Sequence, residues 1–481
     1  MTAHPRNPST TDPAPRLEPV LDKLRSAYLR HGAPSCSERR EHLKRLGQAV
    51  LARQESLIAA VSADFGQRSR TEFLLAEVYT VLAAIRHARR HLRGWMRERR
   101  VPMAMDFWPA RARLRTQPLG VVGIIGPWNY PVLLCLSPLV AALAAGNRVL
   151  LKPSELTPRT SSELAALLGG AFPPDQVAVV QGGAEAGAAV AALPLDHLLY
   201  TGSTAVGRQV LRAAAENLTP VTLEMGGKSP AIIGPDARLD AAAASILYGK
   251  LFNAGQTCIA PDYVLLPEAN KDEFVRLARA AAARMYPRFA GNPDYTAIVN
   301  RRHWERLLGY LEECRVKGAE VVPLWTAPDG PDAARRILPP SLLIQPGDAL
   351  AVAREEIFGP LLVVYTYRRL EDAVTFVNAR PRPLALYYYG ECRADRELIL
   401  GRIVAGGVTV NDSLLHFVAE GLPFGGIGAS GMGAYHGIHG FETFSKKQPI
   451  VLQPRFNFTG LLRPPYGKTA SMLLSWLIRR P

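Results

Sequence analysis

The stretch VVGIIGPWNYPVLLCLSPLVAALAAGNRVLLKPSE, residues 121–155, decides the fold of this chain. It begins with a short apolar run, VVGII, continues with a long apolar stretch that a proline opens, and ends with a second short run, VLLKP. Short apolar runs bounded by turn residues are typical of buried strands, and parallel strands joined through a helix form a right-handed crossover. The stretch therefore predicts a strand–helix–strand unit.

The same rhythm continues toward the C-terminus. Further short apolar runs, separated by helix-like stretches, occur in QVAVVQGG, HLLYTGS and PVTLEMGG. Strands and helices alternating at this pace predict an α/β fold with a Rossmann-like, doubly wound parallel sheet. A second alternating region begins near residue 230, with helices expected at 270–284 and 302–317, and predicts a second α/β domain. Residues 17–100 have apolar positions at helical spacing and predict helices.

The charge and composition exclude some classes of protein. The 481 residues carry a net charge of +15, and 48% of them are hydrophobic, which is ordinary for a globular protein of two or three domains. Much of the charge excess is arginine within residues 86–115. Such a run can bind nucleic acid or an anionic membrane. No aromatic stacking or groove-reading motif accompanies it, so a solvated helix followed by an edge strand is favoured, and no nucleic-acid partner is expected.

The cysteines and the chain ends predict the compartment. Five scattered cysteines, with no CxxC pair and no His/Cys cluster at metal-site spacing, predict free thiols, no metal, and a reducing, cytoplasmic location. Residues 1–16 are polar and rich in Pro and Thr, which indicates a disordered lead-in rather than a signal peptide. No window reaches the ~20 apolar residues of a membrane span. The short apolar core at 472–478 could touch a membrane surface, but packing on the protein or on a second subunit is favoured, without stable membrane insertion.

The ends of the predicted strands are candidate binding positions, because ligands of doubly wound sheets bind at the carboxyl ends of the strands. The simplest dinucleotide fingerprint, GxGxxG after the first strand, is missing. TGSTAVG, residues 201–207, is a glycine-containing strand-to-helix turn whose amides could hold a pyrophosphate. Lys152 follows an apolar strand and can bind a ribose hydroxyl or a phosphate, and Glu155 could accept a hydrogen bond from the other ribose hydroxyl.

Three further residues form a candidate catalytic set. Cys258 lies in the turn NAGQTCIAP, where backbone amides lower the cost of a thiolate; the alternative is a small buried residue. Glu224 ends the apolar strand of LEMGG and suits a general base, the alternatives being a helix cap or a surface salt bridge. Asn129 in GPWNYP can donate to an oxyanion, unless it is an ordinary turn asparagine.

Taken together, these residues predict one type of chemistry. A thiolate that adds to an aldehyde gives a thiohemiacetal, and loss of hydride to a nicotinamide leaves a thioester. A water molecule activated by the carboxylate then hydrolyses the thioester. The sequence therefore predicts the oxidation of an aldehyde.

From about residue 20 to 455 the chain resembles the aldehyde dehydrogenase superfamily. Its class 3 branch, and within it the bacterial coniferyl aldehyde dehydrogenases, are the most similar groups. Seven motifs in the family order carry the resemblance: GPWNYP, LKPSELTP, YTGSTAVG, TLEMGGKSP, NAGQTCIAPDY, EEIFGPLL and LPFGGIGASGMGAYHG.

The resemblance implies a role for each site residue. It makes Cys258 the nucleophile and Glu224 the base, and Asn129 forms the oxyanion hole together with the Cys258 amide. The implied cofactor residues are Lys152 and Glu155 at the adenosine ribose, Gly202, Ser203 and Gly207 at the pyrophosphate, and Glu356 and Phe358 at the nicotinamide ribose and ring.

The resemblance also implies a division into domains and a homodimer. The expected parts are a dinucleotide-binding domain at 17–96 and 119–226, a catalytic domain at 227–420, a bridging and dimerisation element at 97–118 and 440–458, and a C-terminal tail at 459–481.

The expected function is the NAD(P)-dependent oxidation of an aromatic, coniferaldehyde-like aldehyde to its acid. A medium- or long-chain fatty aldehyde is the alternative substrate. A CoA-acylating enzyme, against which Glu224 argues, and a non-enzymatic basic binding protein are further alternatives. NAD is the expected cofactor because Glu155 repels the 2′-phosphate of NADP, although class 3 relatives often accept both.

Overall fold

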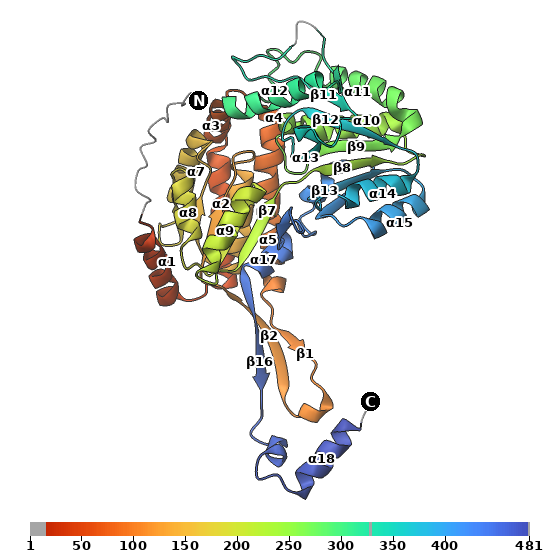
Figure 1. Ribbon diagram of the computed structural model, residues 1–481. Coiled ribbons are helices and arrows are strands. Elements are labelled where there is room, and N and C mark those ends of the chain that lie inside the picture. The colour runs from red at the N-terminus through yellow and green to blue at the C-terminus, as the bar shows by residue number, and fades with distance from the viewer. Residues whose placement is uncertain (1–15, 327–329, 480–481) are drawn as a thin grey trace, which may run out of the picture.

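The computed structural model describes residues 16–326 and 330–479, which contain three β-sheets (Figure 1). The expected lead-in at 1–16 lies outside the described residues, apart from Arg16. A six-stranded sheet has the order β15-β7-β6-β3-β4-β5 and is parallel except at β15. This order confirms the predicted doubly wound parallel sheet. Its strands are β3 (Val121–Ile125), β4 (Arg148–Lys152), β5 (Val177–Val179), β6 (His197–Gly202), β7 (Val221–Met225) and β15 (Gly431–Met432).

Helices cover both faces of this sheet, and alternate residues of β3 show how. Val121 and Ile125 pack with residues of α1, α8 and α9, whereas Val122 and Ile124 pack with residues of α2, α5, α6 and α7. The helices predicted before residue 100 are confirmed. The helices that surround this sheet, before and after residue 100, are α1 (Glu18–His31), α2 (Cys36–Ala52), α3 (Gln54–Phe65), α4 (Arg70–Phe73), a π-helical segment η1 (Leu74–Tyr79), α5 (Thr80–Trp95), α6 (Leu133–Ala145), α7 (Pro158–Ala171), α8 (Ala184–Ala191), α9 (Thr204–Ala215) and α17 (Gly437–Thr443).

Helix α6 follows the loop that carries Asn129, and all of its residues are buried. It packs between the sheet and the helices α2, α5 and α17, which explains why its sequence is apolar on every side. Gly146, with φ 92°, ends the helix in the left-handed conformation.

The second sheet has seven strands in the order β10-β11-β12-β9-β8-β13-β14, all parallel except β10. The helices predicted at 270–284 and 302–317 are confirmed within one residue at each end. The strands are β8 (Ser229–Ile233), β9 (Pro261–Pro267), β10 (Glu320–Pro323), β11 (Ser341–Ile344), β12 (Leu361–Tyr367), β13 (Ala385–Tyr389) and β14 (Gly407–Val410). The helices are α10 (Leu239–Leu251), η3 (Phe252–Gly255), η4 (Glu268–Asn270), α11 (Lys271–Met285), α12 (Arg301–Val316), α13 (Ala351–Arg354), α14 (Leu370–Asn378), α15 (Arg393–Arg402) and α16 (Leu415–Val418).

A third, antiparallel sheet projects from the body of the molecule as an arm (Figure 1). It consists of β1 (Arg99–Val101), β2 (Arg111–Pro118) and β16 (Ser445–Leu452), with η2 (Met105–Phe107) between the first two strands. The chain ends beyond this arm in η5 (Thr459–Leu462) and α18 (Lys468–Ile478).

The apolar C-terminal residues lie in α18, whose main contact within the chain is with η5. Met472 is 67% exposed and Ile478 is 78% exposed, so packing on the body of the same chain, one of the two expected locations, is not observed. Among the described residues, no helix is long and apolar enough to cross a bilayer.

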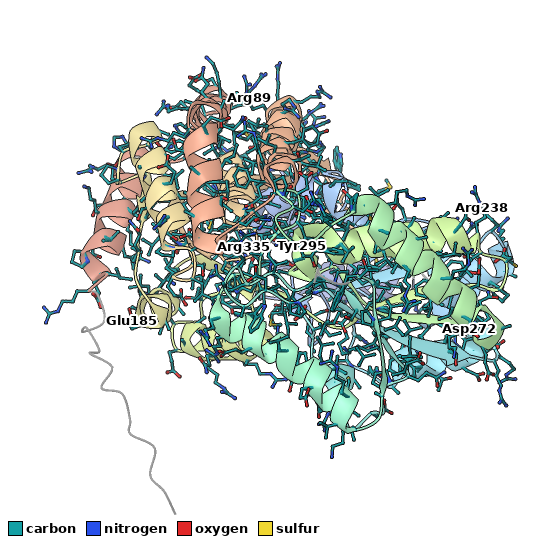
Figure 2. The ribbon with its side chains drawn as sticks, turned by 90° about the horizontal axis from the view of Figure 1, so that it is seen from above. Arg89, Glu185, Arg238, Asp272, Tyr295 and Arg335 are labelled. Atoms are coloured by element: carbon teal, nitrogen blue, oxygen red, sulfur yellow. The ribbon has the colours of Figure 1, made fainter. Side chains whose placement is uncertain are left out.

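In α5 the arginine-rich segment matches the solvated-helix interpretation. Of the strands that follow, β1 lies at an edge of its sheet as expected, whereas β2, which carries Arg111, Arg113 and Arg115, is the central strand and not an edge strand. Arg86, Arg90 and Arg93 of α5 are exposed, and Figure 2 shows Arg89 at the outer edge of the molecule. All five cysteines are free, as their spacing predicts.

Candidate active site

A cavity of about 810 Å³ lies at the carboxyl ends of β3, β4, β6 and β7, where the topology of the sheet predicts a ligand site. The opposite side of the cavity is lined by residues from the part of the chain that forms the second sheet, among them Cys258, Glu356 and Phe358. The cavity brings together nine of the ten residues expected from the sequence: Asn129, Lys152, Glu155, Gly202, Ser203, Glu224, Cys258, Glu356 and Phe358.

Gly207 is the residue that the cavity lining does not include. A Cβ at this position in α9 would lie 2.6 Å from Met225 Sδ and 3.5 Å from the ring of Tyr200. Gly207 therefore lets α9 pack closely on β6 and β7, which is a packing function rather than a contact with the cavity.

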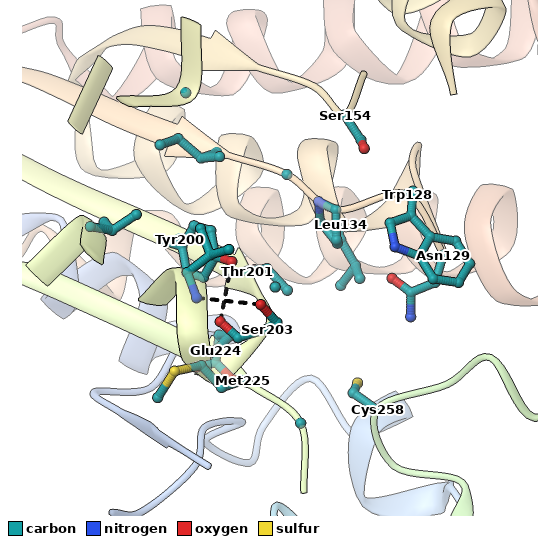
Figure 3. A pocket seen from close by; sticks show the side chains of 18 of the residues that line it. Trp128, Asn129, Leu134, Ser154, Tyr200, Thr201, Ser203, Glu224, Met225 and Cys258 are labelled. Atoms are coloured by element: carbon teal, nitrogen blue, oxygen red, sulfur yellow. Dashed lines mark hydrogen bonds between the residues drawn. The ribbon is translucent and has the colours of Figure 1, made fainter. Parts of the chain in front are cut away.

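The turn before Cys258 has an unusual backbone. Asn253, Ala254 and Gly255 follow one another with φ of 53°, 52° and 74°. Gly255 is required here, because a Cβ at this position would lie 2.3 Å from the carbonyl oxygen of Gly359. This compact turn presents Cys258, partly exposed, to the cavity (Figure 3).

Asn129 lies in the loop between β3 and α6, and hydrogen bonds tie this loop to the Cys258 turn. The Asn129 Nδ2 donates to Gln256 O at 3.2 Å, and the Asn129 carbonyl oxygen accepts from Asn253 Nδ2 at 3.0 Å. An amide nitrogen carries two hydrogens, so the second is available to a bound carbonyl oxygen.

Glu224 is the fourth residue of β7 and is 3% exposed. Neither carboxyl oxygen has a hydrogen-bond partner among the described residues, and the same holds for Thr201 Oγ1 opposite it on β6. Burial raises the pKa of Glu224 well above its ordinary value. A buried, unpartnered carboxyl group in a cavity indicates an exchangeable ligand or water, and a raised pKa suits a general base.

The electrostatic surroundings of Cys258 oppose the thiolate. Burial, followed by the carboxyl groups of Glu356 and Glu224, raises the pKa of Cys258 to about 12. The backbone N–H groups of Cys258 and Ile259 act in the opposite direction and are outweighed. The sulfur is therefore a protonated thiol in this state.

The wall formed by β4, β6 and α9 has the properties of a dinucleotide site. Lys152 is 2% exposed, and its ammonium group forms an ion pair with Glu155, whose side chain is 41% exposed. Ser203 caps α9 by accepting from Val206 N at 3.4 Å, so the positive end of this helix meets the cavity. Gly202 leaves no room for a side chain, because a Cβ there would lie 2.2 Å from Tyr200 Oη.

Glu356 and Phe358 lie in the loop after α13. The Glu356 carboxylate accepts from the backbone N–H of Gly227, and burial raises the pKa of Glu356 to about 8. The ring of Phe358, whose φ is 51°, contacts the ring of Trp128 at a centroid distance of 5.3 Å. Arg306 holds this loop by donating to Glu356 O at 3.3 Å and to Ile357 O at 2.7 Å.

The start of α12 also lines the cavity, a location that the sequence does not predict. Arg302, His303 and Arg306 contribute to the lining, and the His303 ring lies 5.0 Å from the Trp128 ring. The only available signal was the run of basic residues at the predicted start of a helix, a feature that is usually a solvated helix end.

A doubly wound sheet whose cavity holds a cysteine, a buried glutamate and room for a nucleotide is typical of a dinucleotide-dependent oxidoreductase. Residues 16–450 match the aldehyde dehydrogenase family. The chain belongs to this family and is an NAD(P)-dependent enzyme, so the alternative of a non-enzymatic basic binding protein is wrong.

Individual relatives refine the comparison. A "probable coniferyl aldehyde dehydrogenase" of Pseudomonas aeruginosa is 49% identical over 465 residues, covering 97% of both chains. A "coniferyl aldehyde dehydrogenase" of a Pseudomonas species is 46% identical over 467 residues, again 97% of both chains. The solved structure of Staphylococcus aureus AldH in its substrate-bound state superposes with a TM-score of 0.91 at 34% identity, covering 96% of this chain and 100% of that one.

Proposed function

We propose that this enzyme oxidises an aromatic propenal of the coniferaldehyde type to the carboxylic acid, with NAD as the preferred hydride acceptor. The observation that carries the chemistry is that Cys258, Glu224 and Asn129 line one cavity together with a nucleotide-binding wall. The substrate class is supported by the names of the two relatives that are 49% and 46% identical.

The residues of the cavity fit a nicotinamide dinucleotide. Lys152 and Glu155 would bind the adenosine ribose, Gly202 and Ser203 would face the pyrophosphate at the start of α9, and Glu356 would bind the nicotinamide ribose. The bound cofactor supplies the acceptor for a hydride.

The chain's own side chains supply the remaining chemistry. The sulfur of Cys258 forms a bond to the aldehyde carbon while its proton passes to the Glu224 carboxylate. The carbonyl π electrons become an oxyanion, which accepts hydrogen bonds from Asn129 Nδ2 and the Cys258 amide. Loss of hydride from that carbon, with collapse of the oxyanion, leaves a thioester on Cys258.

Hydrolysis of the thioester uses Glu224 a second time. After returning its proton to solvent, the carboxylate takes a proton from water as the water oxygen attacks the thioester carbon. Cleavage of the carbon–sulfur bond releases the acid, and transfer of the proton from Glu224 to the sulfur regenerates the Cys258 thiol and the Glu224 carboxylate.

We also infer that the enzyme is a homodimer and that it is located in a reducing compartment. The arm formed by β1, β2 and β16 leaves one edge of β16 without a partner strand among the described residues, and an unpaired edge can bind a second strand. The cytoplasmic location and the domain boundaries expected from the sequence stay predictions.

Steady-state kinetics with coniferaldehyde, benzaldehyde and a series of straight-chain aldehydes, each with NAD and with NADP, test the proposal. We expect the highest kcat/KM with coniferaldehyde and NAD. A higher value for the long-chain aldehydes would favour the fatty-aldehyde alternative. Product analysis with and without CoA tests the acylating alternative, since a CoA thioester as product would contradict hydrolysis by Glu224.

A further inference from the structure

Three charged side chains lie behind the Asn129 loop without lining the cavity. Arg68, Glu72 and Glu77 are 5%, 8% and 0% exposed. Burying charged groups is costly unless they are paired and hydrogen-bonded, so a cluster of this kind requires an explanation.

Arg68 and Glu77 bind the two ends of the short segment that carries Asn129. Arg68 Nη1 donates to Asn129 O at 3.0 Å, and Arg68 Nη2 contacts Glu77 Oε1 at 3.4 Å. The other oxygen of Glu77 accepts from the backbone N–H groups of Val132 at 2.8 Å and Leu133 at 3.1 Å. The pair therefore fixes the carbonyl of Asn129 and the start of α6 at the same time.

Glu72 connects the same cluster to the nucleophile turn. Its Oε2 accepts from Asn253 N at 3.0 Å and from Thr296 Oγ1 at 3.2 Å. Asn253 is the first left-handed residue of the turn before Cys258, and its side chain donates to Asn129 O, the same oxygen that Arg68 binds. The Asn129 loop and the Cys258 turn therefore share one set of buried anchors.

The neighbouring aromatic residue adds a second connection between these segments. The guanidinium of Arg68 lies 5.0 Å from the centre of the Tyr130 ring, a cation–π arrangement. The hydroxyl of Tyr130 is hydrogen-bonded to Thr257 Oγ1 at 2.6 Å, next to Cys258. Arg68 thus contacts both residues 129 and 130, each of which binds the Cys258 turn.

A π-helical segment explains how both carboxylates reach the cluster. Glu72 and Glu77 are five residues apart, which in a regular α-helix of 3.6 residues per turn places them on different faces. The chain is π-helical from Leu74 to Tyr79, and a π-helix pairs residues five apart. The wider turn therefore allows Glu77 and Glu72 to face the same side, and such turns often occur at functional sites.

We propose that Arg68, Glu72 and Glu77 are positioning residues that fix Asn129 and Cys258 relative to each other, so that the amide of Asn129 meets the oxyanion formed at the sulfur. This inference rests on the proposed function, namely the roles assigned to Asn129 and Cys258. A displacement of a reacting group by about 1 Å can cost on the order of 100-fold in rate, so remote anchors of this kind have a measurable effect.

A double-mutant cycle on kcat tests the proposal, with Arg68→Gln, Asn129→Ala and the combined variant. We expect Arg68→Gln to lower kcat by about 10- to 100-fold without changing the dissociation constant of NAD, because Arg68 does not line the cavity. In the Asn129→Ala background the same substitution should lower kcat by a smaller factor than in the wild type, because the amide that Arg68 positions is absent and only its effect on the Cys258 turn remains. If Arg68 contributes only to the stability of the fold, the losses in kcat should be additive and should follow the fall in the thermal midpoint.

Matched variants keep the result interpretable. Arg70→Gln removes an arginine two positions away whose ion pair with Glu55 is exposed, and it should leave kcat unchanged. If Arg68→Gln does not fold, Arg68→Lys keeps the charge but not the forked geometry, and should lower kcat without changing NAD binding.

Two outcomes overturn the inference: a kcat of the Arg68 variant equal to that of the wild type, or full additivity in the cycle. They are distinguishable from a failure of the proposed function, because that failure appears as an unchanged kcat in Asn129→Ala alone.

Discussion

Replacing Asn129 by alanine is the most direct test of the oxyanion site. The side chain is 3% exposed, and in this structure it uses one amide hydrogen within the protein, toward Gln256 O at 3.2 Å. Truncation removes that bond and the second hydrogen available to substrate. It leaves the backbone oxygen of Asn129, which accepts from Arg68 and Asn253, in place.

The structure separates the cost in stability from the cost in rate. The carbonyl of Gln256 keeps a second donor, Asn253 Nδ2 at 3.0 Å, so no buried acceptor loses its only partner. The free energy of unfolding should therefore fall by only about 1 kcal/mol, the net value of one hydrogen bond. Loss of an oxyanion donor costs about 2.7–4 kcal/mol of transition-state stabilisation, or about 100- to 1,000-fold in kcat.

The assay follows the absorbance of the reduced nicotinamide with coniferaldehyde, together with the thermal midpoint and the dissociation constant of NAD. We expect a large loss in kcat, a small change in midpoint and unchanged NAD binding. Asn217→Ala is a matched control, because this exposed asparagine also donates to a backbone carbonyl, Ala192 O at 2.8 Å, and lies outside the cavity lining. A kcat for Asn129→Ala within about threefold of wild type would refute the assigned role, since a donor to the oxyanion is worth far more.

Four further predictions concern other parts of the site. Glu224→Gln should lower kcat by about 100- to 10,000-fold, because both the attack of Cys258 and the hydrolysis of the thioester use this carboxylate, and an unchanged kcat would contradict these roles. In the wild type, kcat should rise with pH through a range above that of an ordinary carboxyl, because the raised pKa of Glu224 keeps the base protonated below it. Glu155→Gln should raise kcat/KM for NADP relative to NAD by about fivefold, ~1 kcal/mol for one exposed charge, and an unchanged ratio would contradict the repulsion argument. Gly255→Ala should lower the free energy of unfolding by about 1–3 kcal/mol or more, whereas Gly460→Ala, where a Cβ has no neighbour within 4 Å, should match the wild type in thermal denaturation. Alkylation of Cys258 by iodoacetamide in the resting enzyme should be slow at neutral pH and increase steeply above pH 9, because its pKa is about 12; peptide mapping that shows fast labelling at pH 7 would oppose this.

The parts of the fold that the sequence predicts well are those set by local pattern. The βαβ rhythm around residues 121–155 determines the sheet, and in a parallel sheet the strand ends meet at one edge. For this reason the sequence alone predicts that Asn129, Lys152 and Glu224, which lie at the ends of three different strands, share one cleft.

The parts that the sequence does not predict depend on partners distant in the chain. Gly207 belongs to a glycine-containing turn, but the nearest contact of its missing side chain is Met225, on a different strand. Arginine and glutamate are typical of the solvated face of a helix, so the sequence does not mark Arg68, Glu72 and Glu77 as buried. A periodicity of 3.6 residues also cannot reveal the π-helical segment that turns both glutamates inward. Nothing in the sequence of the arm or of the exposed α18 predicts how these segments are oriented relative to the body of the molecule.

The pKa of Cys258 also differs from what its sequence surroundings predict. The turn amides do favour the thiolate of Cys258, as expected, but burial and the carboxyl groups of Glu356 and Glu224 outweigh them. The same burial that raises the pKa of the thiol also raises the pKa of Glu224. Proton transfer from the thiol to the Glu224 carboxylate creates one anion as it neutralises another, so the burial penalties on the two groups largely cancel. A cavity that disfavours each anion by itself therefore still permits the exchange between them.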